Sequence, residues 1–385
     1  MENRMFRSTA KLSVLYFLIY CPLGALCPMI STYLNSIGFS GTQVGIVTSL
    51  GTATAFFAGL FWGGVYSNSH RKRWILAFMC AAAAALALLG TGTKLFFVYT
   101  VIYCCMYFFQ SPLHGLCDSF VLSEGGNFPI VRSMGAIGYA LTVFAAGELA
   151  EARGMENIFY IYAAAFLLAI VVIFCQKEPP YYKERSEDKI KISALLSNKT
   201  YIKLVICAFF VMGTNIAHNT YFAYLFREGG GDVSGLGLAF LLMAGSEAPF
   251  MILLPGLMKK FTSEKLILTA MIVSVIRFGY FATGPAAAML LKTFFLQGIV
   301  NGILLVEVVK YVDRVAGPKH SGVAIAVYYA VTNNLSVILC NLAGGIVLDV
   351  LGARGVYGFL CIMNVISVVL YIAMGLYRDQ EKLVK

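Results

Sequence analysis

Polar side chains recur at helical spacing within an otherwise apolar stretch of this sequence. Steps of three and four residues place such side chains on one face of a helix. The face consists of Tyr99, Tyr103, Tyr107, Gln110, His114 and Asp118. A charge buried in a bilayer without a partner is costly, so intramembrane ionisable groups usually face a partner or a water-filled path. The pattern therefore indicates a functional site.

Arg132 supplies a partner for the acid at the end of this face. Asp118 lies seven residues before Gly125, and Arg132 lies seven residues after it. In a helical hairpin that turns at Gly125, both side chains lie about 10 Å from the turn, at 1.5 Å per residue. We therefore expect Asp118 and Arg132 to pair.

A second group of polar residues interrupts the apolar segments of the C-terminal half. Glu247 and Arg277 each lie roughly 18–21 Å from the cytoplasmic end of a predicted span, near the membrane midplane. A static ion pair between two helices is one interpretation. The other is a proton site, because relative movement of the two groups would change the proton affinity of the carboxylate.

Amide side chains accompany these charges. Asn215 and Asn219 share a face of one span, and amides at this depth either bond neighbouring helices or contact a solute. Gln297 and Asn301 share a face of another span, and Asn333 lies in the span that follows. Both interpretations remain open from the sequence.

The composition defines the class of protein that positions these residues. Of 385 residues, 59% are hydrophobic and only 12% are charged, whereas a soluble domain has roughly 25% charged residues. At about 20 apolar residues per span, an all-α membrane protein with twelve transmembrane helices is expected. The predicted spans are 12–34, 42–66, 74–92, 97–122, 130–150, 157–176, 201–224, 236–258, 265–284, 287–309, 322–345 and 356–377.

The net charge of +10 reflects orientation in the membrane. With the N-terminus inside, most Lys and Arg residues fall in cytoplasmic segments. The outer loops hold only Lys94, Arg153, Arg227 and Arg354. This asymmetry follows the positive-inside rule, predicts that both termini are cytoplasmic and argues against nucleic-acid binding.

The two halves of the chain repeat each other weakly. Gly64 and Gly256, and likewise Leu76 and Leu268, match at an offset of 192 residues. A second echo joins Glu151 to Asp349, each at the end of a predicted span and flanked by glycines. Parallel repeats are typical of transporters. We predict a six-helix half over 1–176, a cytoplasmic linker over 177–199 and a second six-helix half over 200–385.

Enzymatic chemistry has no support in the sequence. All ten cysteines fall inside predicted spans without metal-ligand spacing. No nucleophile with a base and no phosphate-binding loop is recognisable. We therefore expect no catalytic residues, no bound metal and no cofactor.

Several local patterns resemble the major facilitator superfamily, in the branch of lactose permease, phenylpropionate permease and the nucleoside–proton symporters. They are R-S-M-G-A-I-G-Y over 132–139, G-A-L-C-P-M-I-S-T-Y-L over 24–34, G-S-E-A-P over 245–249 and A-G-G-I-V-L-D-V-L-G over 343–352. The resemblance implies the major facilitator fold, with two six-helix pseudo-repeat halves.

The resemblance also implies roles for single residues. Arg132 corresponds to a sugar-binding arginine, Asp118 to its partner acid, and Tyr139 to an aromatic residue that stacks on the sugar ring. Such groups suit vicinal hydroxyls. The family's proton-coupling His and Glu are replaced here by Phe295 and Gly298, so Glu247 with Arg277 becomes the candidate proton-coupling pair.

These observations predict a secondary active transporter in a bacterial cytoplasmic membrane, a multi-pass and monomeric protein whose partners are a solute, protons and lipid. We expect proton-coupled import of a small hydroxylated solute by alternating access, a sugar or oligosaccharide first and a nucleoside second. Alternatives are efflux of apolar compounds, suggested by 15 Met and 14% aromatic residues, and aromatic-acid import. The predicted solute contacts are Asp118, Arg132, Tyr139, His114, Tyr107, Asn215, Asn219, Gln297, Asn301 and Asn333.

Overall fold

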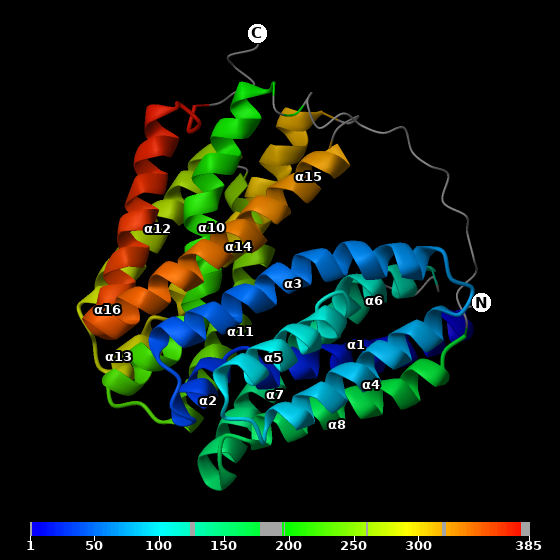
Figure 1. Cartoon of the computed structure of the whole chain (residues 1–385). Coiled ribbons are helices and arrows are strands. Elements are labelled where there is room, and N and C mark those ends of the chain that lie inside the picture. The colour runs from blue at the N-terminus through cyan, green and yellow to red at the C-terminus, as the bar shows by residue number, and fades with distance from the viewer. Residues whose placement is uncertain are drawn as a thin grey trace. The chain divides into compact units, whose positions relative to one another are not determined.

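The computed structural model describes residues 2–123, 128–177, 195, 197–258, 261–317 and 321–378, and every regular element among them is a helix (Figure 1). The first elements are α1 (Glu2–Leu26), α2 (Ile30–Ser36), α3 (Gly41–Ser67), α4 (Lys72–Gly90), α5 (Phe96–Gln110), α6 (Leu113–Ser123), α7 (Phe128–Arg153) and α8 (Asn157–Phe174). They are followed by α10 (Lys199–Glu228), α11 (Val233–Met258), α12 (Ser263–Ala282), α13 (Ala287–Lys292), α14 (Phe294–Ala316), α15 (Ser321–Tyr329), η1 (Ala330–Leu335) and α16 (Ser336–Ala373).

Ten stretches of the described residues are long and apolar enough to cross a membrane. One of them, Val323–Ala373, has 51 residues. At 1.5 Å per residue it is about 76 Å long, more than twice the roughly 30 Å of a bilayer core. Its backbone turns at Gly352, where φ is 69°, so it supplies two crossings. With the 26-residue α11, the total is the predicted twelve.

Several predicted spans are interrupted rather than continuous. The first divides into α1 and α2 around Pro28, and the fourth divides into α5 and α6 at Ser111 and Pro112. Proline lacks a backbone N–H and its ring clashes with the preceding turn, so it breaks a helix. The polar face predicted as one continuous stripe from Tyr99 to Asp118 is therefore split between two helices.

The chain divides into two compact units. Unit 1 comprises Met1–Phe39, Leu50–Arg185 and Asp232–Leu241, and unit 2 comprises Ser40–Ser49, Ser186–Gly231 and Leu242–Lys385. The first turns of α3 thus belong to unit 2, and those of α11 belong to unit 1. The predicted linker 177–199 falls mostly outside the described residues.

Close contact between α1 and α7 forms the centre of unit 1. A Cβ atom added at Gly135 would lie 2.9 Å from the Tyr20 ring and 3.1 Å from the Tyr16 ring. The glycines of the sequence R-S-M-G-A-I-G-Y therefore let the two helices approach closely. This packing holds α7 rigidly beside the polar residues of α1 and α6.

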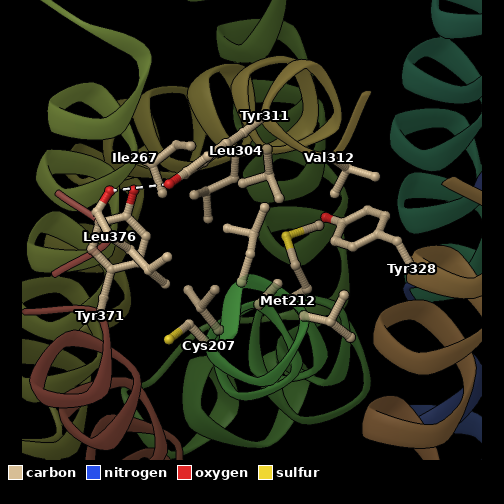
Figure 2. Close-up of a cluster of buried hydrophobic side chains, with 14 of the residues drawn as sticks. Cys207, Met212, Ile267, Leu304, Tyr311, Val312, Tyr328, Tyr371 and Leu376 are labelled. Atoms are coloured by element: carbon tan, nitrogen blue, oxygen red, sulfur yellow. Dashed lines mark hydrogen bonds between the residues drawn. The ribbon is translucent and has the colours of Figure 1, made fainter. Parts of the chain in front are cut away.

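Helix α10 is the central element of unit 2, packed against α12, α14 and α16. Its buried side chains meet an apolar cluster from these helices (Figure 2). Tyr311 donates a hydrogen bond of 3.4 Å to the Leu376 carbonyl, and Tyr371 donates one of 3.1 Å to the Glu264 carbonyl. Tyr311 and Tyr371 thus pair their hydroxyls within the core, which links its helices through backbone carbonyls.

Candidate functional site

Asp118 and Arg132 form the ion pair that the hairpin argument predicted. Arg132 Nη1 donates to both carboxylate oxygens of Asp118, at 3.0 and 2.8 Å. The Arg132 side chain is 53% exposed and that of Asp118 is 29% exposed. The pair is therefore accessible, and its remaining donors and acceptors can meet a solute.

The first two turns of α6 and of α7 position this pair. Pro112 precedes the first residue of α6, where a missing N–H costs no helical hydrogen bond, so α6 restarts there and carries Asp118 in its second turn. Arg132 lies in the second turn of α7, one turn before Gly135. The break and the close α1–α7 contact together fix the place of the pair in unit 1.

His114 and Tyr20 complete the polar group in unit 1. Their ring centroids are 4.6 Å apart with an interplanar angle of 70°, and Arg132 lies close enough to influence Tyr20 electrostatically. His114 Nε2 is buried and has no hydrogen-bond partner. The structure thus brings the predicted His114 to an aromatic residue of α1 that the sequence argument missed. The sequence did contain a signal for this residue, because Tyr16 and Tyr20 are four residues apart and so share one face of a helix. In the structure that face packs against Gly135 of the motif.

Tyr139 and Tyr107 have other surroundings. Tyr139 is half-buried and lies seven residues beyond Arg132, about 10 Å along α7, with its backbone against Gly24. The Tyr107 hydroxyl lies 3.6 Å from Cys27 Sγ, and its ring centroid lies 4.6 Å from that of Tyr103. Contacts of this kind stabilise helix packing, so the structure adds no geometric support for a solute contact by Tyr107.

In unit 2, Glu247 is bound by an amide rather than by an arginine. Asn301 Nδ2 donates to Glu247 Oε1 at 2.7 Å, and Gln297 lies near the same carboxylate. Gln297 and Asn301 lie one turn apart on α14, as predicted. The predicted solute contact Asn301 therefore binds the candidate proton-coupling residue in this structure.

Arg277 is fully buried and forms no ion pair with the described acids. Its Nη1 donates to Asn215 Oδ1 at 3.4 Å, while Nε and Nη2 have no hydrogen-bond partner. The rings of Phe278 and Phe281 lie 5.1 and 5.4 Å from its guanidinium carbon. The static Glu247–Arg277 ion pair considered from the sequence is thus absent, and aromatic faces supply part of the electrostatic compensation.

The Asn215 side chain forms hydrogen bonds within α10 and to α12, whereas Asn219 and Asn333 keep amide donors available. Asn215 Nδ2 donates to the Val211 carbonyl at 2.8 Å and to Ser274 Oγ of α12 at 3.3 Å. Asn219, one turn along α10, is half-buried and makes no hydrogen bond with the described residues. Asn333 accepts a hydrogen bond from Thr332 within η1, a π-helical turn of a kind frequent at functional sites.

The described residues contain no group of three or more His, Cys, Asp or Glu side chains placed to hold a metal ion. The polar groups found in each unit are instead ionisable and amide side chains at membrane depth within helical bundles. An all-helical membrane protein with such sites in two compact units has the architecture of a solute transporter.

Comparison with known proteins gives the same class and defines the family. Residues 9–359 match the model of the MFS_1 like family, and the chain belongs to that family of the major facilitator superfamily. It is a multi-pass membrane transporter of small solutes, not an enzyme.

Individual relatives extend this similarity over almost the whole chain. The chain is 31% identical to the maltose permease of Geobacillus stearothermophilus over 371 residues, which cover 94% of this chain and 93% of the relative. It is 26% identical to the putative nucleoside transporter YegT of Escherichia coli, covering 82% and 78%. The crystal structure of the nucleoside transporter NupG superimposes with a TM-score of 0.84 at 18% identity, covering 97% and 99%, and confirms the predicted fold.

Proposed function

We propose that the chain imports a small hydroxylated solute together with protons, by alternating access of its two units. A sugar or oligosaccharide is the first candidate and a nucleoside the second. The similarity to a maltose permease over 94% of the chain favours the sugar, and the similarity to a putative nucleoside transporter keeps the nucleoside in the test.

The accessible Asp118–Arg132 pair carries this proposal. A guanidinium has five N–H donors, and Arg132 uses only those of Nη1 on Asp118. Nε and Nη2 make no hydrogen bond with the described residues. An arginine held by an acid, with donors remaining on one side, can bind two neighbouring hydroxyls of a sugar ring or of a ribose.

Proton coupling is assigned to Glu247, with Arg277 as the charge that modulates it. Glu247 is held by Asn301, and two nitrogens of Arg277 lack partners. A shift of the carboxylate from the amides to the guanidinium would favour its ionised form, and a shift back would favour protonation. Movement of helices within unit 2 would thereby couple proton binding to solute transport.

The first test measures external pH around liposomes that contain the purified protein in a weakly buffered medium. Maltose, uridine and an aromatic acid are added one at a time. We expect alkalinisation with one class of solute, lost in Arg132→Ala and retained in Arg153→Ala, whose side chain is exposed at the far end of α7. Solute entry without a pH change would overturn proton coupling, and full uptake by Arg132→Ala would overturn the site.

A second test separates coupling from solute binding. Glu247→Gln should retain exchange of labelled solute across the membrane but lose uphill uptake. The glutamine amide can still form hydrogen bonds, but it cannot bind and release a proton. Glu156→Gln, which changes an exposed acid, is the matched control and should retain both activities. Uphill uptake by Glu247→Gln at the rate of the unmodified protein would remove Glu247 from this role.

A further inference from the structure

We propose that the hydroxyl of Tyr20 is a solute-binding group that sets specificity beside the Asp118–Arg132 pair. This inference rests on the proposed function, because it names an additional contact for the same hydroxylated solute. Tyr20 belongs to α1, and neither the periodic polar face nor the arginine motif points to it.

Three neighbours fix the orientation of the Tyr20 ring. Tyr16 stacks on it with centroids 5.5 Å apart and an interplanar angle of 22°. The His114 ring meets it nearly edge-on at 4.6 Å. Gly135 leaves the space in which both tyrosine rings lie, since its missing Cβ would lie within 3.1 Å of each. A side chain held from several directions presents its terminal group with little entropic cost on binding.

The terminal group itself is uncommitted. Tyr20 is half-buried, and its hydroxyl makes no hydrogen bond with the described residues. The stacked Tyr16 differs, because it is fully buried and its hydroxyl is enclosed without a partner. Of the two stacked hydroxyls, only that of Tyr20 is accessible to a solute.

The position of Tyr20 relative to Arg132 supports the same assignment. Its ring packs on Gly135, three residues and about 4.5 Å along α7 from Arg132. The unpartnered Nε2 of His114 lies on the neighbouring ring. A ring solute bound by Arg132 would therefore lie beside the Tyr20 ring, which packs about one helical turn from Arg132, whereas Tyr139 lies two turns away.

The test compares Tyr20→Phe with Tyr16→Phe, using labelled maltose, or uridine if uridine is the solute that enters. Each variant removes one hydroxyl from the same ring stack. Loss of a neutral hydrogen bond should raise the half-saturation concentration about three- to tenfold in Tyr20→Phe. Tyr16→Phe should leave it unchanged, and the maximal rate should stay the same in both.

A set of monodeoxy analogues supplies a readout that a structural role would not change. The analogue that lacks the hydroxyl bound by Tyr20 should bind the unmodified protein and Tyr20→Phe equally, whereas the parent solute should distinguish them. Equal affinities of both variants for the parent, with uptake lost in Arg132→Ala, would overturn the Tyr20 assignment and leave the proposed function intact. Uptake of no solute class, or uptake independent of Arg132, would overturn the proposed function and this inference with it.

Discussion

Two arginines of this transporter, the partly exposed Arg314 and the buried Arg277, are compensated in different ways. Arg314 pairs with Glu264 at 2.6 Å, and that glutamate is 1% exposed. Arg277 is 0% exposed and has aromatic rings and one amide instead of an acid. Removing one member of a buried ion pair leaves a charge without compensation, whereas removing a buried charge that lacks a partner does not.

The two arginines should therefore respond oppositely to the same substitution. We expect Arg314→Met to destabilise unit 2 by about 1–3 kcal/mol, since it leaves the buried carboxylate of Glu264 without its partner. Arg277→Met should retain or raise the melting temperature while abolishing uphill uptake. Thermal unfolding in detergent, followed by size-exclusion chromatography, measures the first effect. A larger loss of stability in Arg277→Met than in Arg314→Met would contradict this account.

At the scale of elements, two acids bind the first N–H groups of two helices. Asp349 precedes the turn of α16 at Gly352, and Glu151 lies in the last turn of α7. Asp349 of α16 accepts from the Gly41 and Thr42 N–H groups at 2.6 and 2.7 Å, at the start of α3. Glu151 of α7 accepts from the Val233 N–H group at 2.9 Å, at the start of α11. Carboxylates favour helix N-termini because of unpaired N–H groups and the helix dipole. The sequence echo between Glu151 and Asp349 thus corresponds to a repeated capping contact.

Loss of one cap should have a measurable effect on stability. Asp349→Ala removes both acceptors of the α3 N-terminus and should cost about 0.5–2 kcal/mol. Asp349→Asn keeps one acceptor oxygen and should cost less. Melting temperatures of the two variants, compared with that of Glu156→Ala as an exposed control, test the order. Equal stability of Asp349→Ala and the unmodified protein would show that water replaces the cap.

The packing of α1 against α7 should be sensitive to the addition of one methyl group. A Cβ at Gly138 would overlap the backbone carbonyl of Phe17, whereas a Cβ at Gly115 would meet nothing within 4 Å. We expect Gly138→Ala to cost about 1–3 kcal/mol through overpacking and to weaken solute binding by shifting α1. Gly115→Ala should be neutral or stabilising, because alanine favours helix. Expression, melting temperature and uptake of both variants provide the comparison, and indistinguishable behaviour would contradict the close crossing.

The span positions and the Asp118–Arg132 pair were predictable, because hydropathy and residue spacing along a helix determine both. Tyr20 was not, because its role depends on which face of α1 packs against Gly135, and sequence spacing does not specify helix pairing. The hydrogen-bond partner of Glu247 was also not predicted. Depth placed Glu247 and Arg277 at the same level, but side-chain reach and the position of Asn301 decided which partner the carboxylate has. The division of the fourth span at Pro112 was likewise not predicted, because hydropathy alone predicts one continuous span over residues 97–122.

At the scale of the whole molecule, charge asymmetry predicts the orientation of all twelve crossings. The arginine and lysine residues assigned to outer segments are few, namely Lys94, Arg153, Arg227 and Arg354. Basic clusters resist translocation, so segments that contain them stay in the cytoplasm. Residues 71–73, Arg-Lys-Arg, provide the densest such cluster, and we expect them to anchor the connection between α3 and α4 on the inner side.

This orientation predicts which reporter proteins are active when they are fused to segments on the two sides of the membrane. A fluorescent protein fused after residue 385 should fold and fluoresce, because the positive-inside distribution keeps that end in the cytoplasm. Alkaline phosphatase, which is active only after export, should be active when fused after Gly154, between α7 and α8, and inactive when fused after Ser69, between α3 and α4. Replacing Arg71, Lys72 and Arg73 by glutamine should weaken this preference and raise phosphatase activity at Ser69. Phosphatase activity at Ser69 but not at Gly154 in the unmodified protein would establish the opposite orientation, and the inner and outer faces assigned to every loop would have to be exchanged.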